Sequence, residues 1–143
     1  TEVSSLLLLK RNPANLSTEL ELMGESMEFV SISKDGKELS AKEFSLATDR
    51  LIVHGIQSDS FQLQIKNRIH PQKNTALEGF YQSGNILCTQ CESEGFRKIT
   101  YFLDRPDVMA KYTTTLSADK KKYPLLLSNG NRVKAGDLPE GRH

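Results

Sequence analysis

Short apolar runs of β-favouring residues, separated by turn residues, set the pattern of this chain. In residues 61–69, Phe61, Leu63, Ile65 and Asn67 fall on one face, while the Gln and Lys residues between them fall on the other. A period of two is typical of a half-buried antiparallel strand. Other runs that predict strands cover residues 3–10, 27–34, 51–56, 111–119 and 123–131.

Residues 27–40 predict a β-hairpin. Their alternation places Phe29 on one face of the first strand and Val30 and Ile32 on the other. Asp35-Gly36 then supplies the dipeptide that tight hairpin turns prefer, because both positions need a positive φ.

Helical spacing occurs only in residues 93–103, where Phe96, Ile99 and Leu103 recur at helical intervals before Pro106. We therefore expect one short helix or a few 3₁₀ turns. No repeat and no linker divides the chain. The prediction is a mainly β fold, an antiparallel sheet or sandwich, in a single domain over residues 1–143.

Charge and cysteine content exclude several classes of protein. The 143 residues carry a net charge of +1, which gives no electrostatic basis for binding nucleic acid or an anionic membrane. The longest apolar run, Leu6 to Leu9, is too short to cross a bilayer. The chain begins without Met and resembles a piece of a longer protein. Two cysteines favour a reducing, cytoplasmic location over a disulfide framework.

The two cysteines, Cys88 and Cys91, stand at C-x-x-C spacing. A structural zinc site needs four ligands, and His54, His70 and His143 are too scattered to complete one predictably. A redox pair normally opens a helix in a βαβ unit, which this pattern lacks. The third alternative is that both thiols pack as small hydrophobic groups.

The packing alternative draws attention to the neighbouring polar residues. If a strand runs from Ile86 through Glu92, its period of two places Gln90 and Glu92 on one face, about 7 Å apart. An amide oxygen and a carboxylate together suit an ammonium group. Further on, Arg97, Asp104 and Arg105 predict an ion-paired turn.

Residues 74–133, from "NTALEGFYQSGNILCTQCESEG" to "LLLSNGNRV", closely resemble the N-terminal domain of the bacterial aminopeptidase N family, zinc metallopeptidases of the gluzincin group. The family pattern, T-Q-x-E followed by Arg and D-x-P, is met by Thr89, Gln90, Glu92, Arg97, Asp104 and Pro106. Tyr101 departs from the Pro that many relatives outside the bacterial branch carry.

This resemblance implies a saddle-like β domain in which Gln90 and Glu92 bind the free α-amine of a peptide substrate. The family's H-E-x-x-H zinc helix and its G-A-M-E-N segment are not in this sequence. The resemblance thus implies a fragment that lacks the catalytic domain, binds no metal itself and is inactive alone. Its expected partners are peptide substrates and its own catalytic domain, in a monomer.

Two other classes compete with this interpretation. One is a non-catalytic β-sandwich module that binds a peptide or a protein. The other is a redox or zinc module built on Cys88 and Cys91. An H-E-x-x-H motif encoded after His143 would favour the enzyme over the binding module. Thiol titration together with metal analysis would test the redox or zinc module.

Overall fold

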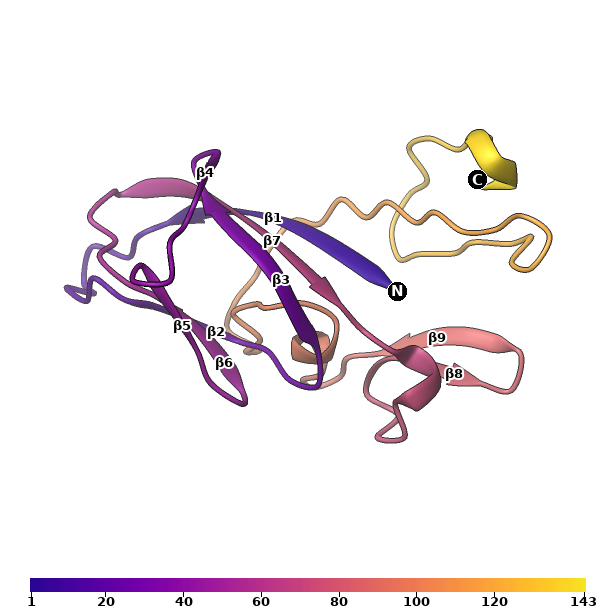
Figure 1. The fold of residues 1–143 in the computed structure, drawn as a ribbon, viewed down its shortest axis with the longest axis horizontal. Helices are drawn as coiled ribbons and strands as arrows, with labels where there is room; N and C mark the ends of the chain where they lie inside the picture. Colours follow the sequence, from indigo (N-terminus) through magenta and orange to yellow (C-terminus); the bar gives the residue numbers. More distant parts are fainter. The chain divides into compact units, whose positions relative to one another are not determined.

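The computed structural model describes residues 1–143, which fall into two compact units, Thr1–Val108 and Met109–His143 (Figure 1). The single domain expected for the whole chain stays a prediction. The strands are β1 (Glu2–Lys10), β2 (Leu20–Met23), β3 (Glu28–Lys34), β4 (Lys37–Glu38), β5 (Phe44–Leu46), β6 (Arg50–Val53), β7 (Ser60–Arg68), β8 (Gly79–Ser83) and β9 (Ile86–Gln90).

A mainly β architecture is therefore confirmed, with antiparallel pairing throughout. Three short 3₁₀ turns accompany the strands: η1 (Pro71–Lys73), η2 (Phe96–Lys98) and η3 (Pro139–Gly141). The turn η2 lies where the sequence predicted a short helix or 3₁₀ segment. None of these turns is long or apolar enough to span a lipid bilayer.

Strand β7 is the centre of a four-stranded sheet with the order β1-β7-β3-β4. Its predicted alternation is confirmed, because Phe61, Leu63, Ile65 and Asn67 are all buried while the residues between them are exposed. Figure 1 shows β1 and β3 flanking β7 on either side. One face of β7 thus forms one side of the hydrophobic core.

The β3–β4 hairpin is also confirmed, and its turn residues Asp35 and Gly36 both adopt positive φ. The predicted faces of β3, however, were wrong. Phe29 pairs with Asn67 and Ser31 pairs with Lys66, so Val30 is the extra residue of a β-bulge. The bulge turns Phe29 to the same side as Ile32, and both contact the core.

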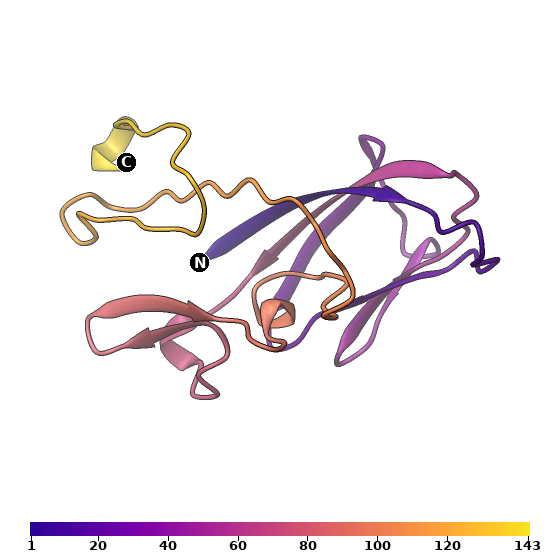
Figure 2. The ribbon, with the colours of Figure 1, turned by 180° about the vertical axis from the view of Figure 1, so that it is seen from behind.

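A second sheet, with the order β2-β6-β5, closes the core from the other side (Figure 2). Leu22 of β2 and Leu51 and Val53 of β6 pack with Leu63 and Ile65 of β7. All five side chains are at most 1% exposed, so the hydrophobic effect acts on nearly their whole surface. The strand predicted at Leu51 is confirmed as β6.

Two strands predicted in the second unit are absent. Neither residues 111–119 nor residues 123–131 belong to a sheet, although single bridges join Asp119 and Leu138 to Arg142. Strand propensity measures how well a side chain fits a pleated, half-buried surface. These segments have no neighbouring strand, and Leu125 and Leu127 remain exposed. The β-favouring composition of residues 111–119 and 123–131 was therefore not sufficient for them to form strands.

Candidate functional site

The candidate site lies where β9 ends, in the hairpin that β9 forms with β8. Gln90 is the last residue of β9 and pairs with Gly79, the first residue of β8. The ladder stops there, so the strand does not continue through Glu92, as the period-two argument required. Cys91 to Gly95 instead form a loop that leads into η2 (Figure 2).

Gln90 and Glu92 nevertheless lie close together on the surface. Both residues are exposed, and the Gln90 side-chain amide donates to the Glu92 carbonyl oxygen over 3.4 Å. No hydrogen bond or ion pair engages the Glu92 carboxylate itself. The pair therefore presents an amide oxygen and an uncommitted carboxylate on the surface, brought together by a turn rather than a strand. That this pair binds an amine stays a prediction.

Two glycines allow the loop to fold back on the hairpin. A Cβ on Gly79, whose φ is +71°, would stand 2.6 Å from the Lys98 Cβ. A Cβ on Gly95, whose φ is +145°, would stand 3.0 Å from the Gln90 carbonyl oxygen. Any other residue at these positions would both strain the backbone and push the loop away. Sequence reasoning missed both glycines, and only the close packing of the loop reveals their role.

Asp104 ties the loop to the rest of the unit. Its Oδ2 atom accepts hydrogen bonds from the backbone amides of Gly95 and Arg97, both at 3.1 Å, and from Nε of Arg97 at 2.8 Å. Nη2 of Arg97 also donates to the Asp104 carbonyl oxygen at 2.8 Å. The predicted ion-paired turn is confirmed for Arg97 and Asp104, whereas Arg105 pairs with Asp107.

The ionised state of Asp104 is favoured by these donors. Burial alone would raise the pKa of the Asp104 carboxyl, but hydrogen bonds from the Arg97 side chain and from the Gly95 and Arg97 amides outweigh it and lower the pKa below its usual value. Arg97 has further acidic neighbours in Glu94 at 2.8 Å and Glu25 at 3.9 Å. The sequence pattern did not reveal these two partners.

The cysteines are free and half-buried. Burial, and after it the negative charge of Asp104, raises the pKa of the Cys91 thiol. A redox cysteine needs the opposite shift, because the thiolate is the reactive form. The burial of Cys91 and the raised pKa of its thiol therefore favour packing over redox chemistry.

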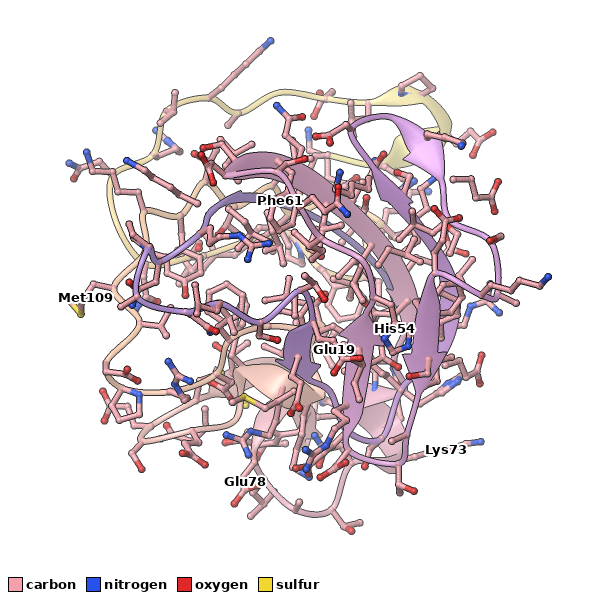
Figure 3. All side chains as sticks on the ribbon, turned by 90° about the vertical axis from the view of Figure 1, so that its left-hand side faces the viewer. Glu19, His54, Phe61, Lys73, Glu78 and Met109 are labelled. Carbon is pink, nitrogen blue, oxygen red and sulfur yellow. The ribbon has the colours of Figure 1, made fainter.

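No cluster of His, Cys, Asp and Glu suits a metal ion. No group of three or more such side chains comes together, whereas zinc sites take three or four protein ligands. His54 instead lies beside Glu19 (Figure 3), with 2.9 Å between its Nδ1 and a carboxylate oxygen of Glu19, and His70 contacts Glu28 at 2.8 Å. His143 donates to the Tyr123 carbonyl oxygen at 2.8 Å. The residues of this chain do not fit a zinc ion, which the resemblance assigns to the catalytic domain.

The surface around Gln90 and Glu92 is open. Two hollows of about 230 and 290 Å³ occur elsewhere, one over β3, β4 and β7 and one beside η1 and β8, and neither residue lines them. A ligand on the exposed pair would therefore contact this unit along one side.

Comparison with known proteins places the chain in context. The peptidase M1 N-terminal domain family matches residues 9–143. Aminopeptidase N of Escherichia coli is 54% identical over 125 residues, and that of Haemophilus influenzae is 49% identical over 129 residues. These alignments cover 87% and 90% of this chain but only 14% and 15% of the relatives. The chain thus spans about one-seventh of their length.

A solved structure agrees over nearly the whole chain. Legionella pneumophila aminopeptidase A, in complex with aspartic acid, superposes with a TM-score of 0.93 at 34% sequence identity. The match covers 99% of this chain and 17% of that protein.

Proposed function

Because the chain belongs to the peptidase M1 N-terminal domain family, we propose that it serves as the N-terminal domain of a zinc aminopeptidase, an enzyme that removes amino acids from the N-terminus of peptides. The resemblance drawn from residues 74–133 is confirmed by these relatives. The proposed contribution of this domain is to hold the free α-amine of the substrate, while peptide hydrolysis uses groups outside this chain.

The observation that carries this proposal is the uncommitted carboxylate of Glu92 beside the Gln90 amide. A substrate ammonium has three N–H donors and a full positive charge. Glu92 would supply the charge-assisted hydrogen bond and Gln90 a second acceptor. The aspartic acid bound to the Legionella relative is a free amino acid, which is the class of ligand that such a pair recognises.

Selection for a free amino terminus follows from desolvation. An amide at the same position has no charge to offer, so enclosing Glu92 against it would leave a carboxylate unpaired. Because this chain presents the pair on an open surface, we propose that the catalytic domain supplies the opposite wall. Two free cysteines support a cytoplasmic location for the protein, which we propose to be monomeric.

The test uses the full-length protein that contains this chain. Glu92→Gln removes the charge and keeps the size, and Glu38→Gln on the exposed β4 strand is the matched control. We expect Glu92→Gln to lower kcat/KM on an amino-acid p-nitroanilide by about 30- to 800-fold, equivalent to the 2–4 kcal/mol of a charged hydrogen bond. Glu38→Gln should leave kcat/KM unchanged.

The same enzymes should be tested with the N-acetylated anilide. If Glu92 selects the free amine, Glu92→Gln should narrow the preference for the free over the acetylated substrate. A full-length protein that binds peptides without cleaving any of them would support the non-catalytic binding module instead. Unchanged kinetics of Glu92→Gln would remove Glu92 from the site.

A further inference from the structure

One oxygen atom organises the loop that bears the candidate site. Oδ2 of Asp104 accepts three hydrogen bonds, one from Gly95 and two from Arg97, and the residue is only 8% exposed. A carboxylate has about four lone-pair positions, and here a single oxygen accepts from the last residue of the loop and from Arg97 of η2. The buried Asp104 carboxylate thus holds the end of the loop and the start of η2 in place.

The loop is fixed at both of its ends. Gln90 is held by its ladder pairing with Gly79, and Gly95 is held by its hydrogen bond to Asp104. Only residues 91–94 lie between these two points. Within them Cys91 is half-buried and Glu92 is exposed, so the backbone of this short span decides where the Glu92 carboxylate points.

Asp104 is in turn connected to the core sheets. Its backbone amide contacts Sδ of Met23 at 3.2 Å, and Met23 exchanges two backbone hydrogen bonds with Phe102. The segment after η2 is also held by Asn67 of β7, whose amide nitrogen donates to the Ile99 carbonyl oxygen at 2.9 Å. Hydrogen bonds thus anchor Asp104 and the segment after η2 to β2 and β7, and through Asp104 they anchor the loop.

We propose that Asp104 is a positioning residue for amine recognition: by collecting the Gly95 and Arg97 donors it sets the orientation of Glu92 relative to Gln90. This inference rests on the proposed function of that pair. Asp104 is buried and acts through the loop, without touching the substrate. Its loss should therefore affect recognition of the free amine beyond any effect on the stability of the fold.

The first experiment measures order in the loop without using activity. In the 143-residue chain, Cys88→Ser leaves Cys91 as the single thiol. Its reaction with a maleimide is followed across pH, and the rate constant of the thiolate form reports access to the loop, since the charge of Asp104 also acts on the pKa of this thiol. Asp104→Asn should speed this reaction on the order of tenfold, because the amide cannot hold the Arg97 guanidinium as an anion does. The matched control is Asp107→Asn, since that exposed carboxylate pairs only with Arg105.

The second experiment is a double-mutant cycle in the full-length protein. Asp104→Asn should lower kcat/KM on the free-amine anilide on the order of tenfold, since a displacement near 1 Å can have such an effect, and the change should be mostly in KM. In the Glu92→Gln background the same substitution should have little further effect. If the loss of kcat/KM in the double variant equals the product of the losses in the two single variants, the two residues act independently and the positioning role is refuted.

The two experiments separate this inference from the proposed function. Unchanged labelling of Cys91 with an impaired Glu92→Gln enzyme would refute the role of Asp104 alone. If Asp104→Asn speeds the labelling of Cys91 but Glu92→Gln leaves kcat/KM unchanged, the amine-binding role of Glu92 is refuted. The proposal that Asp104 positions Glu92 for amine recognition is then refuted as well. If Asp104→Asn does not fold, Arg97→Lys keeps the positive charge but loses the Nε and Nη2 donors, and it should change both measurements in the same direction.

Discussion

Asn67 is a polar residue in the middle of the core, and its replacement by Asp gives a demanding test of the fold. The side chain is 1% exposed, between Val3 of β1 and Phe29 of β3 in the sheet. Its nitrogen donates to the Ile99 carbonyl oxygen, and its own oxygen has no partner. Asn67→Asp would place a carboxylate against a carbonyl oxygen where no donor is available.

The expected magnitude follows from the linkage between protonation and folding. A fully buried carboxyl has its pKa raised by 3 to 5 units, so it folds in the protonated form and its O–H can donate to Ile99. Each pH unit above the unfolded pKa of about 3.9 then costs about 1.4 kcal/mol. We expect a loss of about 4 kcal/mol at pH 7 and about 1.5 kcal/mol at pH 5. The variant is thus nearest to the original chain below pH 4, and its deficit grows as pH rises toward the folded-state pKa.

The assay is urea unfolding of the 143-residue chain and of Asn67→Asp, followed by circular dichroism between pH 4.5 and pH 7. Because the original chain is measured at each pH, its own acid response cancels in the difference. Asn131→Asp, at an exposed position, is the control and should differ from the original chain by less than about 0.5 kcal/mol. A deficit for Asn67→Asp that does not change with pH would refute the reasoning, since it would mean that the carboxylate reaches water or a cation.

Two further predictions concern packing. Leu63→Ala, at a side chain with 0% exposure, should lower the free energy of unfolding by about 3 kcal/mol, whereas Leu8→Ala on the 73% exposed outer face of β1 should change it by less than about 0.5 kcal/mol in the same urea assay. Gly79→Ala should destabilise the chain by about 2 kcal/mol more than Gly84→Ala, because both glycines have positive φ but only a Cβ on Gly79 would clash with Lys98. Equal losses of stability in thermal unfolding would show that Lys98 moves aside without cost.

Elements that carry their own pattern were predictable. The alternation of β7 and the Asp35-Gly36 turn depend on neighbouring residues, and both were confirmed. The bulge at Val30 was not visible, because an inserted residue is defined by the register of the partner strand. The same reason explains the missing strands at residues 111–119 and 123–131, since a β-favouring composition does not guarantee a neighbour to pair with.

The candidate site was predictable in its residues and not in its geometry. Gln90 and Glu92 stood out through their chemistry and through the family motif, whereas their assignment to one strand face was wrong because the β8–β9 ladder ends at the pair of Gly79 and Gln90. The partners of Asp104 could be named only in part. Its ion pair with Arg97 follows from charges seven residues apart, while the Gly95 amide is recruited by a fold of the loop that no local pattern encodes.

The pairing of β1 with β7 has a consequence during synthesis. Glu2 pairs with Arg68 and Lys10 with Ser60, so β1 has no partner until 50 to 66 further residues have been made. At ribosomal rates of 5–20 residues per second this interval lasts roughly 3 to 13 s. During it the run Leu6 to Leu9 is an unpaired apolar segment of the kind that associates between nascent chains. Among the strands of this chain, β1 therefore waits longest for the strand that pairs with it.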